Sequence, residues 1–371
     1  MERSGTVLGG MENKGFARAI VAEGTASSGI KIWASVGAAW LTLFSYLIIS
    51  WVGSDYIGRT PTGVDPVPGW MQTLATTLDI VSPIFWLICV YIFIVRPWRR
   101  DGALSTDGMF LIAWLTMYVQ DPWLNGTQYW LAFNSAHFNL GCWVTELPGW
   151  NSPNLNLLPE PLLCWGFGYS WMGFLPTLGG LWAMRKMKAT RPQTGVVGLF
   201  LIAFTAMAVL DFVIEGFFVR THLYAYLGAI PWLSLWAGEI HQFPVYEIFF
   251  WSLNWTVIIQ FMYYKNDKGE MWMHRGSQKL GVSNKFKKAL QLVAIIGLCN
   301  TVELFTYNIP LQFFAMHAAP FPKDTPTYLL NGICGKGTKY SCPGPDVPIP
   351  RMTSSAVPPE KGYCPNIGGC D

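Results

Sequence analysis

Several carboxylic acids of this sequence stand inside long apolar stretches, where ionisable side chains are rare and costly. Asp211 and Glu215 are four residues apart, a spacing that places both on one face of a helix. Glu247 opens a second apolar stretch, and Glu303 lies in a third. Two carboxyls in one dry site do not both ionise easily, so one can hold a proton to donate while its neighbour accepts one. We therefore predict acid–base chemistry, with these acids as the catalytic candidates.

Other polar residues near the same ends of the apolar stretches are candidates for contacting a substrate. They are Asp79, Asp121, Asn134, Trp150, Arg220, His222, Asn254 and Asn300. For each single residue a structural role is the alternative, because acids and amides within membrane helices also pair with neighbouring helices. Asp79 lies in the outer half of its stretch and Asp121 at the outer end of its stretch, and water near the membrane interface could solvate them.

The sequence carries no motif typical of metal or nucleotide chemistry. His137, His222, His241 and His317 fall on the same predicted side, but no HxxxH or HxxE spacing places a pair of ligands on a helix. Walker, GxGxxG and GxSxG motifs are absent, which argues against a nucleotide-driven pump and a serine hydrolase. We expect no metal and no cofactor. The many aromatic residues fit an interfacial belt, and several rings could line a cavity.

The elements that must position these acids are membrane helices. Apolar residues make up 51% of the 371 residues and charged residues only 13%, against about 25% charged residues in soluble domains. Stretches of roughly the 20 residues that a span needs lie at 30–52, 70–95, 106–120, 162–184, 194–219, 243–264 and 288–316. The stretch 223–236 is broken by Gly228 and Pro231, so we interpret it as a re-entrant or interfacial segment. The predicted fold class is an all-α, polytopic bundle of about seven transmembrane helices.

Basic residues predict the orientation of this bundle. They gather in the connections after the second, fourth and sixth stretches: Arg96, Arg99, Arg100, Arg185, Lys186, Lys188, Arg191, Lys265, Lys268, Arg275, Lys279, Lys285, Lys287 and Lys288. Cytoplasmic loops are rich in such residues, so the N-terminus is predicted inside and the C-terminus outside. The expected parts are a cytoplasmic segment 1–29, a membrane domain 30–316 with an outer loop 121–161, and an extracytoplasmic tail 317–371.

This topology predicts an integral, multi-pass protein of a bacterial plasma membrane. The first span is expected to act as an uncleaved anchor, because the residues before it are polar. The basic residues lie in separate loops rather than along one continuous basic surface, so no nucleic-acid partner is expected. Membrane lipids and a hydrophobic small molecule or lipid are the expected partners, and a partner subunit stays open.

Two features lie on the predicted outer side. The tail carries Cys334, Cys342, Cys364 and Cys370, and disulfides persist in an oxidising compartment. Their pairing stays open, since four cysteines allow three pairings, and a zinc site is the alternative although no CxxC pair is present. The loop 121–161 is dense in aromatic, Asn, Gly and Pro residues. We interpret it either as an ordered lid over an outer cavity or as a structural cap.

A set of short motifs runs from about residue 31 to residue 350. They are Arg96-Pro97-Trp98-Arg99-Arg100-Asp101, Asp107-Gly108, Gln120-Asp121-Pro122, the stretch from Asn134-Ser135 to Pro148-Gly149-Trp150, Pro159-Glu160-Pro161, Asp211 with Glu215, the segment from Gln242-Phe243-Pro244 to Glu247, and Gly332-Ile333-Cys334-Gly335 with Cys342-Pro343. In these motifs the chain resembles the AveC-like spirocyclases, a family named for the enzyme that shapes the spiroketal of avermectin.

The resemblance implies a membrane enzyme that acts on a hydrophobic, polyketide-like or lipid-like substrate. The reaction it implies is closure of a dihydroxyketone to a spiroketal, or a related dehydration, in an outer-side cavity. One alternative is a membrane terpene cyclase, which also uses intramembrane acids to protonate its substrate. The other is a non-catalytic lipid-binding or transport accessory protein, in which the acids organise a cavity for a lipid head group.

Overall fold

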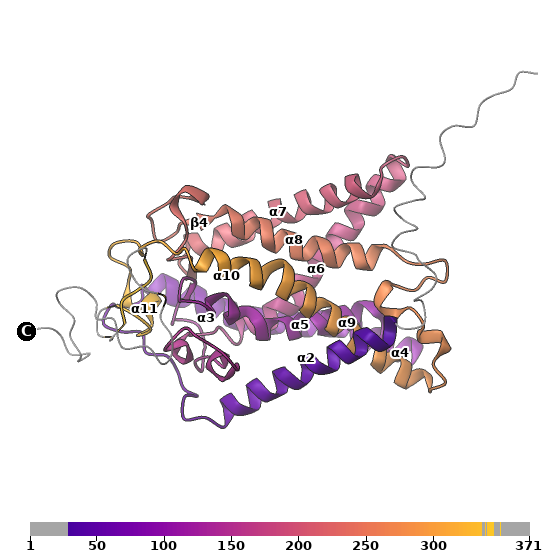
Figure 1. The fold of residues 1–371 in the computed structure, drawn as a ribbon, viewed down its shortest axis with the longest axis horizontal. Helices are drawn as coiled ribbons and strands as arrows, with labels where there is room; N and C mark the ends of the chain where they lie inside the picture. The colour runs from indigo at the N-terminus through magenta and orange to yellow at the C-terminus, as the bar shows by residue number, and fades with distance from the viewer. Residues whose placement is uncertain (1–28, 336–337, 339, 345–348, 350–371) are drawn as a thin grey trace, which may run out of the picture.

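Long helices run side by side through most of the chain (Figure 1). The computed structural model describes residues 29–335, 338, 340–344 and 349. Its longer helices are α2 (Gly29–Val52), α3 (Gly69–Val90), α5 (Thr106–Met117), α6 (Cys164–Thr190), α7 (Val196–Arg220), α8 (Val245–Tyr263) and α9 (Asn284–Glu303). The described strands are only two residues long, so the fold is predominantly helical, as predicted.

Two of the helices continue through a wide π-helical turn. After α3 come the π turn η2 (Tyr91–Val95) and α4 (Arg96–Asp101); after α9 come η9 (Leu304–Asn308) and α10 (Ile309–Ala315). Each π turn is followed within two residues by a proline, Pro97 or Pro310. Proline has no N–H to donate to the preceding turn, which explains why the α-helical ladder is interrupted at these two places.

Four helical segments of the described chain are long and apolar enough to cross a membrane: Gly29–Val52, Gly69–Asp101, Val196–Arg220 and Asn284–Ala315. Helix α5 does not extend to residue 120 as expected, because it gives way to the 3-10 helix η3 (Tyr118–Asn125), which contains Pro122. At 12 residues, α5 is about 18 Å long and lies in the middle of the bundle, with Trp114 fully buried. Seven spans and the orientation remain predictions.

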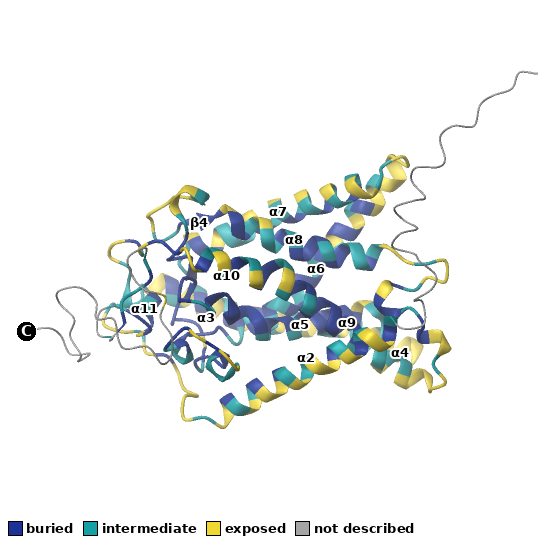
Figure 2. Ribbon diagram, viewed as in Figure 1, coloured by how far each residue is buried: buried dark blue, intermediate teal, exposed yellow. Residues whose placement is uncertain are grey.

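The two ends of the bundle differ in chemistry. The three basic connections lie together at the end where α2 begins, and the backbone N–H of Ile30 donates there to the C=O of Arg275 (3.0 Å). The other end is covered by loops and is called the capped end below. Between the ends, apolar side chains are exposed on the outer faces of α2, α3 and α7, among them Ile49, Ile80 and Val197 (Figure 2). A lipid-facing surface has this composition.

The capped end is built from loops that are far apart in the sequence. Strand β1 (Ala132–Phe133) from the loop 121–161 pairs with β2 (Tyr224–Ala225), and β3 (Ser234–Leu235) pairs with β4 (Phe243–Pro244) just before α8. Two 3-10 turns, η4 (Val144–Glu146) and η5 (Leu155–Leu157), complete the loop. The segment 223–236 belongs to this cap and forms no helix beyond the single turn η6 (Pro231–Leu233), in agreement with the prediction that it does not span.

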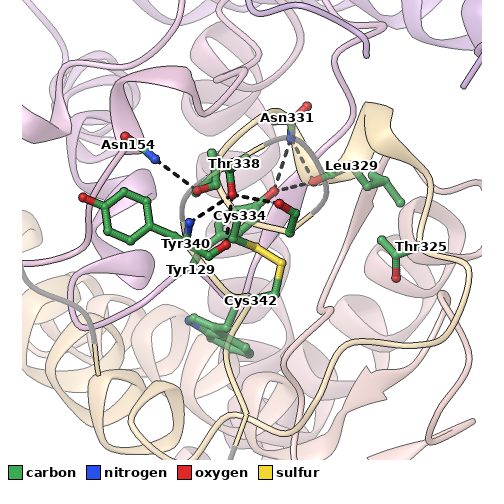
Figure 3. Close-up of a disulfide and its surroundings, with 12 residues drawn as sticks. Tyr129, Asn154, Thr325, Leu329, Asn331, Cys334, Thr338, Tyr340 and Cys342 are labelled. Carbon is green, nitrogen blue, oxygen red and sulfur yellow. Dashed lines mark hydrogen bonds between the residues drawn. A yellow bond between two sulfur atoms is a disulfide. The ribbon is translucent and has the colours of Figure 1, made fainter. Parts of the chain in front are cut away.

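The tail after α10 packs onto the cap. Helix α11 (Thr327–Leu330) is followed by a disulfide between Cys334 and Cys342, which closes a short loop (Figure 3). The side-chain amide of Asn331 donates to the C=O of Phe133 in strand β1 (2.9 Å). This disulfide confirms one pair among the candidate cysteines, whereas Cys364 and Cys370 lie outside the described residues.

Helices α2 and α9 cross with their backbones in contact. A Cβ on Gly37 would lie 1.9 Å from the C=O oxygen of Val293, and a Cβ on Gly297 would lie 2.5 Å from the C=O oxygen of Trp33. The atoms in the way belong to the backbone, so they cannot move aside as a side chain can. Glycine at both positions therefore permits this close crossing, as in other small-residue helix contacts in membranes.

We predict that Gly37→Leu destabilises the protein by about 3 kcal/mol or more, because overpacking of a close contact costs roughly 1–3 kcal/mol and here the obstacle is backbone. Gly216→Leu on α7 is the matched control, since a Cβ there meets nothing within 4 Å. Thermal unfolding of the detergent-solubilised variants measures the difference. Equal midpoints for the two variants would contradict the close crossing.

Candidate functional site

Three of the four catalytic candidates converge at one place. Asp211 and Glu215 lie one turn apart on α7, and Glu247 lies in the first turn of the neighbouring helix α8. One carboxylate oxygen of each residue lies within 4.8 Å of the other two. Asp211 and Glu247 are fully buried, and Glu215 is half-buried. The spacing in the sequence predicted the first two as a pair, and helix packing adds the third.

Tyrosines, rather than cations, donate to this acid cluster. The hydroxyl of Tyr226, beside β2, donates to Glu215 Oε2 (2.8 Å), and the hydroxyl of Tyr307, in the π turn η9, donates to Glu247 Oε1 (2.9 Å). One carboxylate oxygen of Glu215 lies within 4.8 Å of one of Glu247, close enough for the two carboxyls to share a proton. Both oxygens of Asp211 lack a donor among the described residues, and no described lysine or arginine forms an ion pair with the cluster.

The cluster opens onto a small cavity of about 70 Å³ under the cap. Asp121, Asp211 and Glu215 are the carboxylic acids on its wall. The other lining residues are Leu124, Leu131, Phe133, Trp165, Gly168, Tyr169, Met172, Gly173, Ile214, Phe218, Tyr224, Tyr226, Trp251, Trp255 and Tyr307. Aromatic rings thus surround the acids, in line with the expectation that several rings could line a cavity. A space of this size holds two or three water molecules, or one reacting group of a larger molecule.

A second carboxyl pair lies in the cap, next to the same cavity. Asp121, in η3, lies against Glu160 from the loop 121–161, and Asp121 Oδ1 accepts a hydrogen bond from the hydroxyl of Tyr169. Burial raises the pKa of Asp121 to about 6. Burial, and then the charge of Asp121, raise the pKa of Glu160 well above its usual range. At neutral pH this pair keeps a proton, so the cavity has proton donors on two sides.

Glu303 and Asn300 lie behind the cavity in a separate polar network. The side-chain amide of Gln120 donates to Asn300 Oδ1 (2.9 Å) and to Glu303 Oε2 (3.2 Å), and Asn300 Nδ2 donates to Thr116 Oγ1 (2.8 Å). These contacts join α5 and η3 to α9. Glu303 does not line the cavity, so its catalytic role and the binding role of Asn300 stay predictions with a clear structural alternative. Asn254 is also buried away from the wall, with Thr306 as its partner (3.5 Å).

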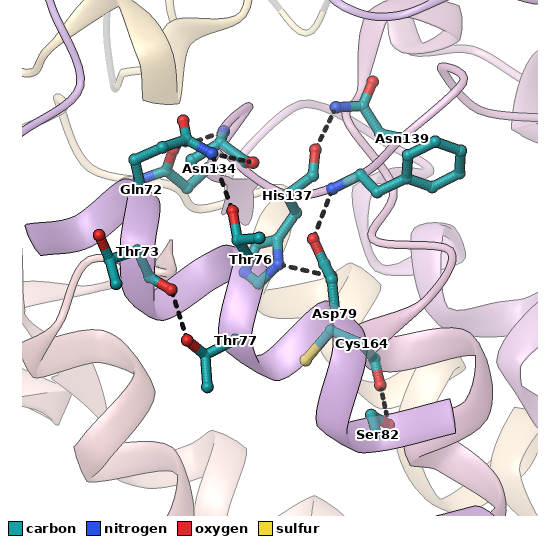
Figure 4. Close-up of polar contacts among 12 residues, drawn as sticks. Gln72, Thr73, Thr76, Thr77, Asp79, Ser82, Asn134, His137, Asn139 and Cys164 are labelled. Atoms are coloured by element: carbon teal, nitrogen blue, oxygen red, sulfur yellow. Dashed lines mark hydrogen bonds and ion pairs between the residues drawn. The ribbon is translucent and has the colours of Figure 1, made fainter. Parts of the chain in front are cut away.

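Asp79 and Asn134 hold the cap in place (Figure 4). Asp79 on α3 contacts His137 Nδ1 through Oδ1 (3.1 Å) and accepts from the backbone N–H of Phe138 through Oδ2 (2.7 Å). Asn134 Nδ2 donates to the C=O of His222 (2.9 Å). Both contacts tie the loop 121–161 to other elements, and neither Asp79 nor Asn134 lines the cavity.

The remaining binding candidates lie elsewhere on the cap. The guanidinium of Arg220 contacts His241 Nε2 (3.0 Å) and stacks over the ring of Trp236. The imidazoles of His222 and His241 are stacked with 6.3 Å between their centroids. Trp150 donates to the C=O of Ser152 (2.8 Å) and borders a different, shallow pocket. The structure does not bring these residues to the acid cluster.

Two groups of side chains in the described chain are close enough to share a metal ion. One is Asp211, Glu215 and Glu247, and the other is Asp79, His137 and Cys164. In the second group both oxygens of Asp79 already contact protein nitrogens, which fits a tether between α3 and the cap. In the first group the hydroxyls of Tyr226 and Tyr307 already donate to two of the three carboxyls. The expectation of a site without metal stays a prediction.

Comparison with known proteins assigns the chain to a family. The family model described as "Spirocyclase AveC-like" matches residues 98–329, more than half of the chain. The protein belongs to the AveC-like spirocyclase family. The matched region includes Asp121, Glu160 and the whole acid cluster, and it ends within α11. No curated protein and no solved structure matches the chain.

Sequence reasoning did not single out the hydroxyls and the cap acid of this AveC-like protein's site. Tyr169, Tyr226 and Tyr307 come from three different elements, and tyrosine is too common near membrane interfaces to stand out. Pro310, close after Tyr307, signalled a break in the last helix and could have drawn attention to that turn. Glu160 stood between two prolines in a quoted motif, but nothing in its spacing pointed to Asp121.

We predict that Asp121→Asn weakens the dependence of stability on pH. A carboxyl with a folded pKa of about 6 stabilises the fold below its unfolded value, and this stabilisation is lost as the pH rises through 6. At 1.36 kcal/mol per pKa unit, the wild type loses up to about 3 kcal/mol from Asp121 between about pH 4 and pH 7. The amide variant lacks this loss.

Thermal unfolding in detergent over this pH range measures the effect. Asp101→Asn is the control, because that carboxyl is exposed and forms an ion pair with Arg100. The control should keep the slope of the wild type. Identical slopes for all three proteins would mean that Asp121 ionises freely in the folded state.

Proposed function

We propose that this AveC-like protein is a membrane-embedded acid–base cyclase that works without a cofactor. The observation that carries the proposal is the convergence of three carboxyls beside an aromatic cavity: Asp211 and Glu215 lie on its wall, Glu247 lies beside them, and no described lysine or arginine forms an ion pair with them. Three carboxyls in such surroundings retain protons, and a retained proton is what an acid catalyst must deliver. The family membership supports a cyclase, and closure of a hydrophobic dihydroxyketone to a spiroketal is the reaction that we assign to it.

The proposed reaction balances without redox chemistry. One hydroxyl of the substrate adds to its ketone and forms a hemiketal. A protonated carboxyl then donates its proton to the hemiketal hydroxyl. The C–O bond breaks, water departs, and an oxocarbenium ion is formed. The second hydroxyl forms the new C–O bond and gives its proton to a neighbouring carboxylate. A proton returned between neighbouring carboxyls resets the site, so the net change is loss of one water.

The contacts of each acid support particular roles. Asp211 has no donor among the described residues and so has its proton available for the leaving hydroxyl. Glu215, on the cavity wall, accepts from Tyr226, which stabilises a carboxylate that takes up the last proton. Glu247, beside it, accepts from Tyr307 and can exchange a proton with Glu215. Aromatic rings line the cavity, and the electron-rich face of such a ring attracts a cation. The cavity wall then decides which face of the ion the second hydroxyl attacks.

We predict that Asp211→Asn lowers turnover by about 100-fold or more, the usual contribution of a general acid. The asparagine keeps the shape of the side chain but has no acidic proton. Wild type and variant are purified in detergent, incubated with a long-chain dihydroxyketone, and followed by mass spectrometry for loss of one water, together with the small molecules that co-purify. A cyclised molecule with the wild type and its open precursor with the variant support the proposal.

Asp107→Asn is the matched control, because it removes a carboxyl in the first turn of α5, at the end opposite the cap. It should turn over like the wild type. Full activity of a folded Asp211→Asn protein would overturn the assignment of the acid. Recovery of the same unmodified lipid from wild type and variant would instead support a lipid-binding or transport role.

A membrane terpene cyclase is the second candidate, favoured by the rings of Trp165, Trp251 and Trp255 on the cavity wall. Such an enzyme protonates an olefin or epoxide and guides the cation that forms, for which aromatic faces are suitable. Incubation with a prenylated substrate separates the two reactions, because terpene cyclisation forms carbon–carbon bonds whereas spiroketal closure forms carbon–oxygen bonds.

A further inference from the structure

A long apolar groove opens on the outer face of the bundle between α3, α6 and α7. Its volume is about 650 Å³. The residues that line it are Leu78, Val81, Ser82, Cys164, Trp171, Met172, Leu175, Pro176, Gly179, Leu210, Val213, Ile214, Phe217 and Phe218. Ser82 already donates to the C=O of Cys164 (2.8 Å) and accepts from Trp171 (3.1 Å), so its hydroxyl is not free for a ligand. The groove therefore offers an almost wholly apolar surface.

The groove faces the region where lipid is expected and also meets the acidic cavity. Val81, Val213 and Phe217 on its rim are exposed, on helices that are long and apolar enough to cross a membrane. On the inner side, the groove and the cavity share Ile214 and Phe218 as wall residues, together with Met172 from α6. The two hollows are thus separated by single side chains.

The volumes of the acidic cavity and the groove indicate that they accommodate different parts of a substrate. The acidic cavity, at about 70 Å³, admits only the reacting group of a substrate. The groove, at about 650 Å³, lies within the roughly 300–1,000 Å³ typical of small-molecule sites. A hydrophobic substrate whose oxygen-bearing part reacts at the acids must place the rest of its length elsewhere, and the groove is adjacent.

We propose that the groove binds the hydrocarbon chain of an amphiphilic substrate that enters sideways from the bilayer. The oxygen-bearing end of this substrate passes Met172, Ile214 and Phe218 to reach the acid cluster. Helix α6 runs from Cys164 at the capped end toward the opposite end, so the chain lies along α6 with its far end near Gly179 and Leu210. The inference rests on the proposed function only in naming the acidic cavity as the destination of the polar end.

Photo-crosslinking of the full-length protein in detergent tests this orientation of the substrate along α6. The probes are two long-chain primary alcohols, one with a diazirine next to the hydroxyl and one with a diazirine near the far end of the chain. We expect the first to label peptides around Met172 and Ile214, and the second to label peptides around Gly179 and Leu210. Excess phospholipid should compete poorly with either probe, because two acyl chains and a head group need more space than the groove's volume of about 650 Å³.

Gly179→Leu tests the groove directly. A Cβ at Gly179 meets nothing within 4 Å, so leucine can enter the groove without displacing the backbone. We expect labelling by the far-end probe to fall about tenfold, the scale of effect for altering an apolar pocket by a few methylene groups. Gly216→Leu is the matched control: its Cβ is equally unobstructed, but Gly216 lines neither hollow, and labelling should stay at the wild-type level.

Labelling spread evenly over the lipid-facing helices, or unchanged in Gly179→Leu, would overturn the inference, as would equal displacement by phospholipid. Labelling needs no turnover, so Asp211→Asn should bind both probes as the wild type does. If the groove is labelled but Asp211→Asn still cyclises its substrate, the proposed function fails and the groove stands. If Asp211→Asn is inactive but labelling is diffuse, the groove fails and the proposed function stands.

Discussion

The carboxyls around the cavity are buried among aromatic rings and, within the described chain, none of them pairs with a lysine or arginine. An isolated charge in such surroundings is very costly, so the acids must share protons or hydrogen bonds with one another. Glu215 lies beside Glu247, and Asp121 lies beside Glu160, so that each pair is placed to share a proton. Tyrosine hydroxyls supply the remaining donors without adding positive charge. A cluster stabilised in this way keeps acidic protons in an apolar setting.

Much of the remaining structure serves to hold these acids together. The acids come from α7, α8, η3 and the cap, and the tyrosine donors come from α6, the residue that follows β2, and a π turn. Their relative positions therefore depend on helix packing and on the attachment of the cap. Asp79 ties the cap to α3 through His137, and Asn331 ties the tail to β1. Displacing the cap would admit water to the acids and remove the condition that keeps them protonated.

Polar residues of this protein thus have two distinct uses. Gln120, Asn300 and Glu303 join helices in a network that does not reach the cavity wall. Asp211, Glu215 and Asp121 lie on the cavity wall. Both groups consist of buried polar residues in apolar segments, and burial alone does not separate them. What separates them is whether neighbouring side chains leave a hollow beside the acid.

The sequence alone determined the class of fold and the acid pair on α7. A deficit of charge and long apolar stretches require helices in lipid, because every backbone polar group must be satisfied within the helix. A spacing of four residues fixes Asp211 and Glu215 on one face, since helix geometry is local. The helical stretches, the non-spanning segment 223–236 and the family followed from such local patterns and motifs.

Only the tertiary structure decided which candidates belong to the site. Glu247, Glu160, Tyr226 and Tyr307 join the acids through contacts between elements far apart in the chain, which depend on how helices pack rather than on local spacing. The same packing assigned Asp79 and Asn134 to the cap and left Arg220 on the surface. Helix α5 is also shorter than its apolar composition predicted. It ends at Met117, before the 3-10 helix η3 that contains Pro122. Hydropathy records how apolar a segment is, whereas packing decides what each side chain faces.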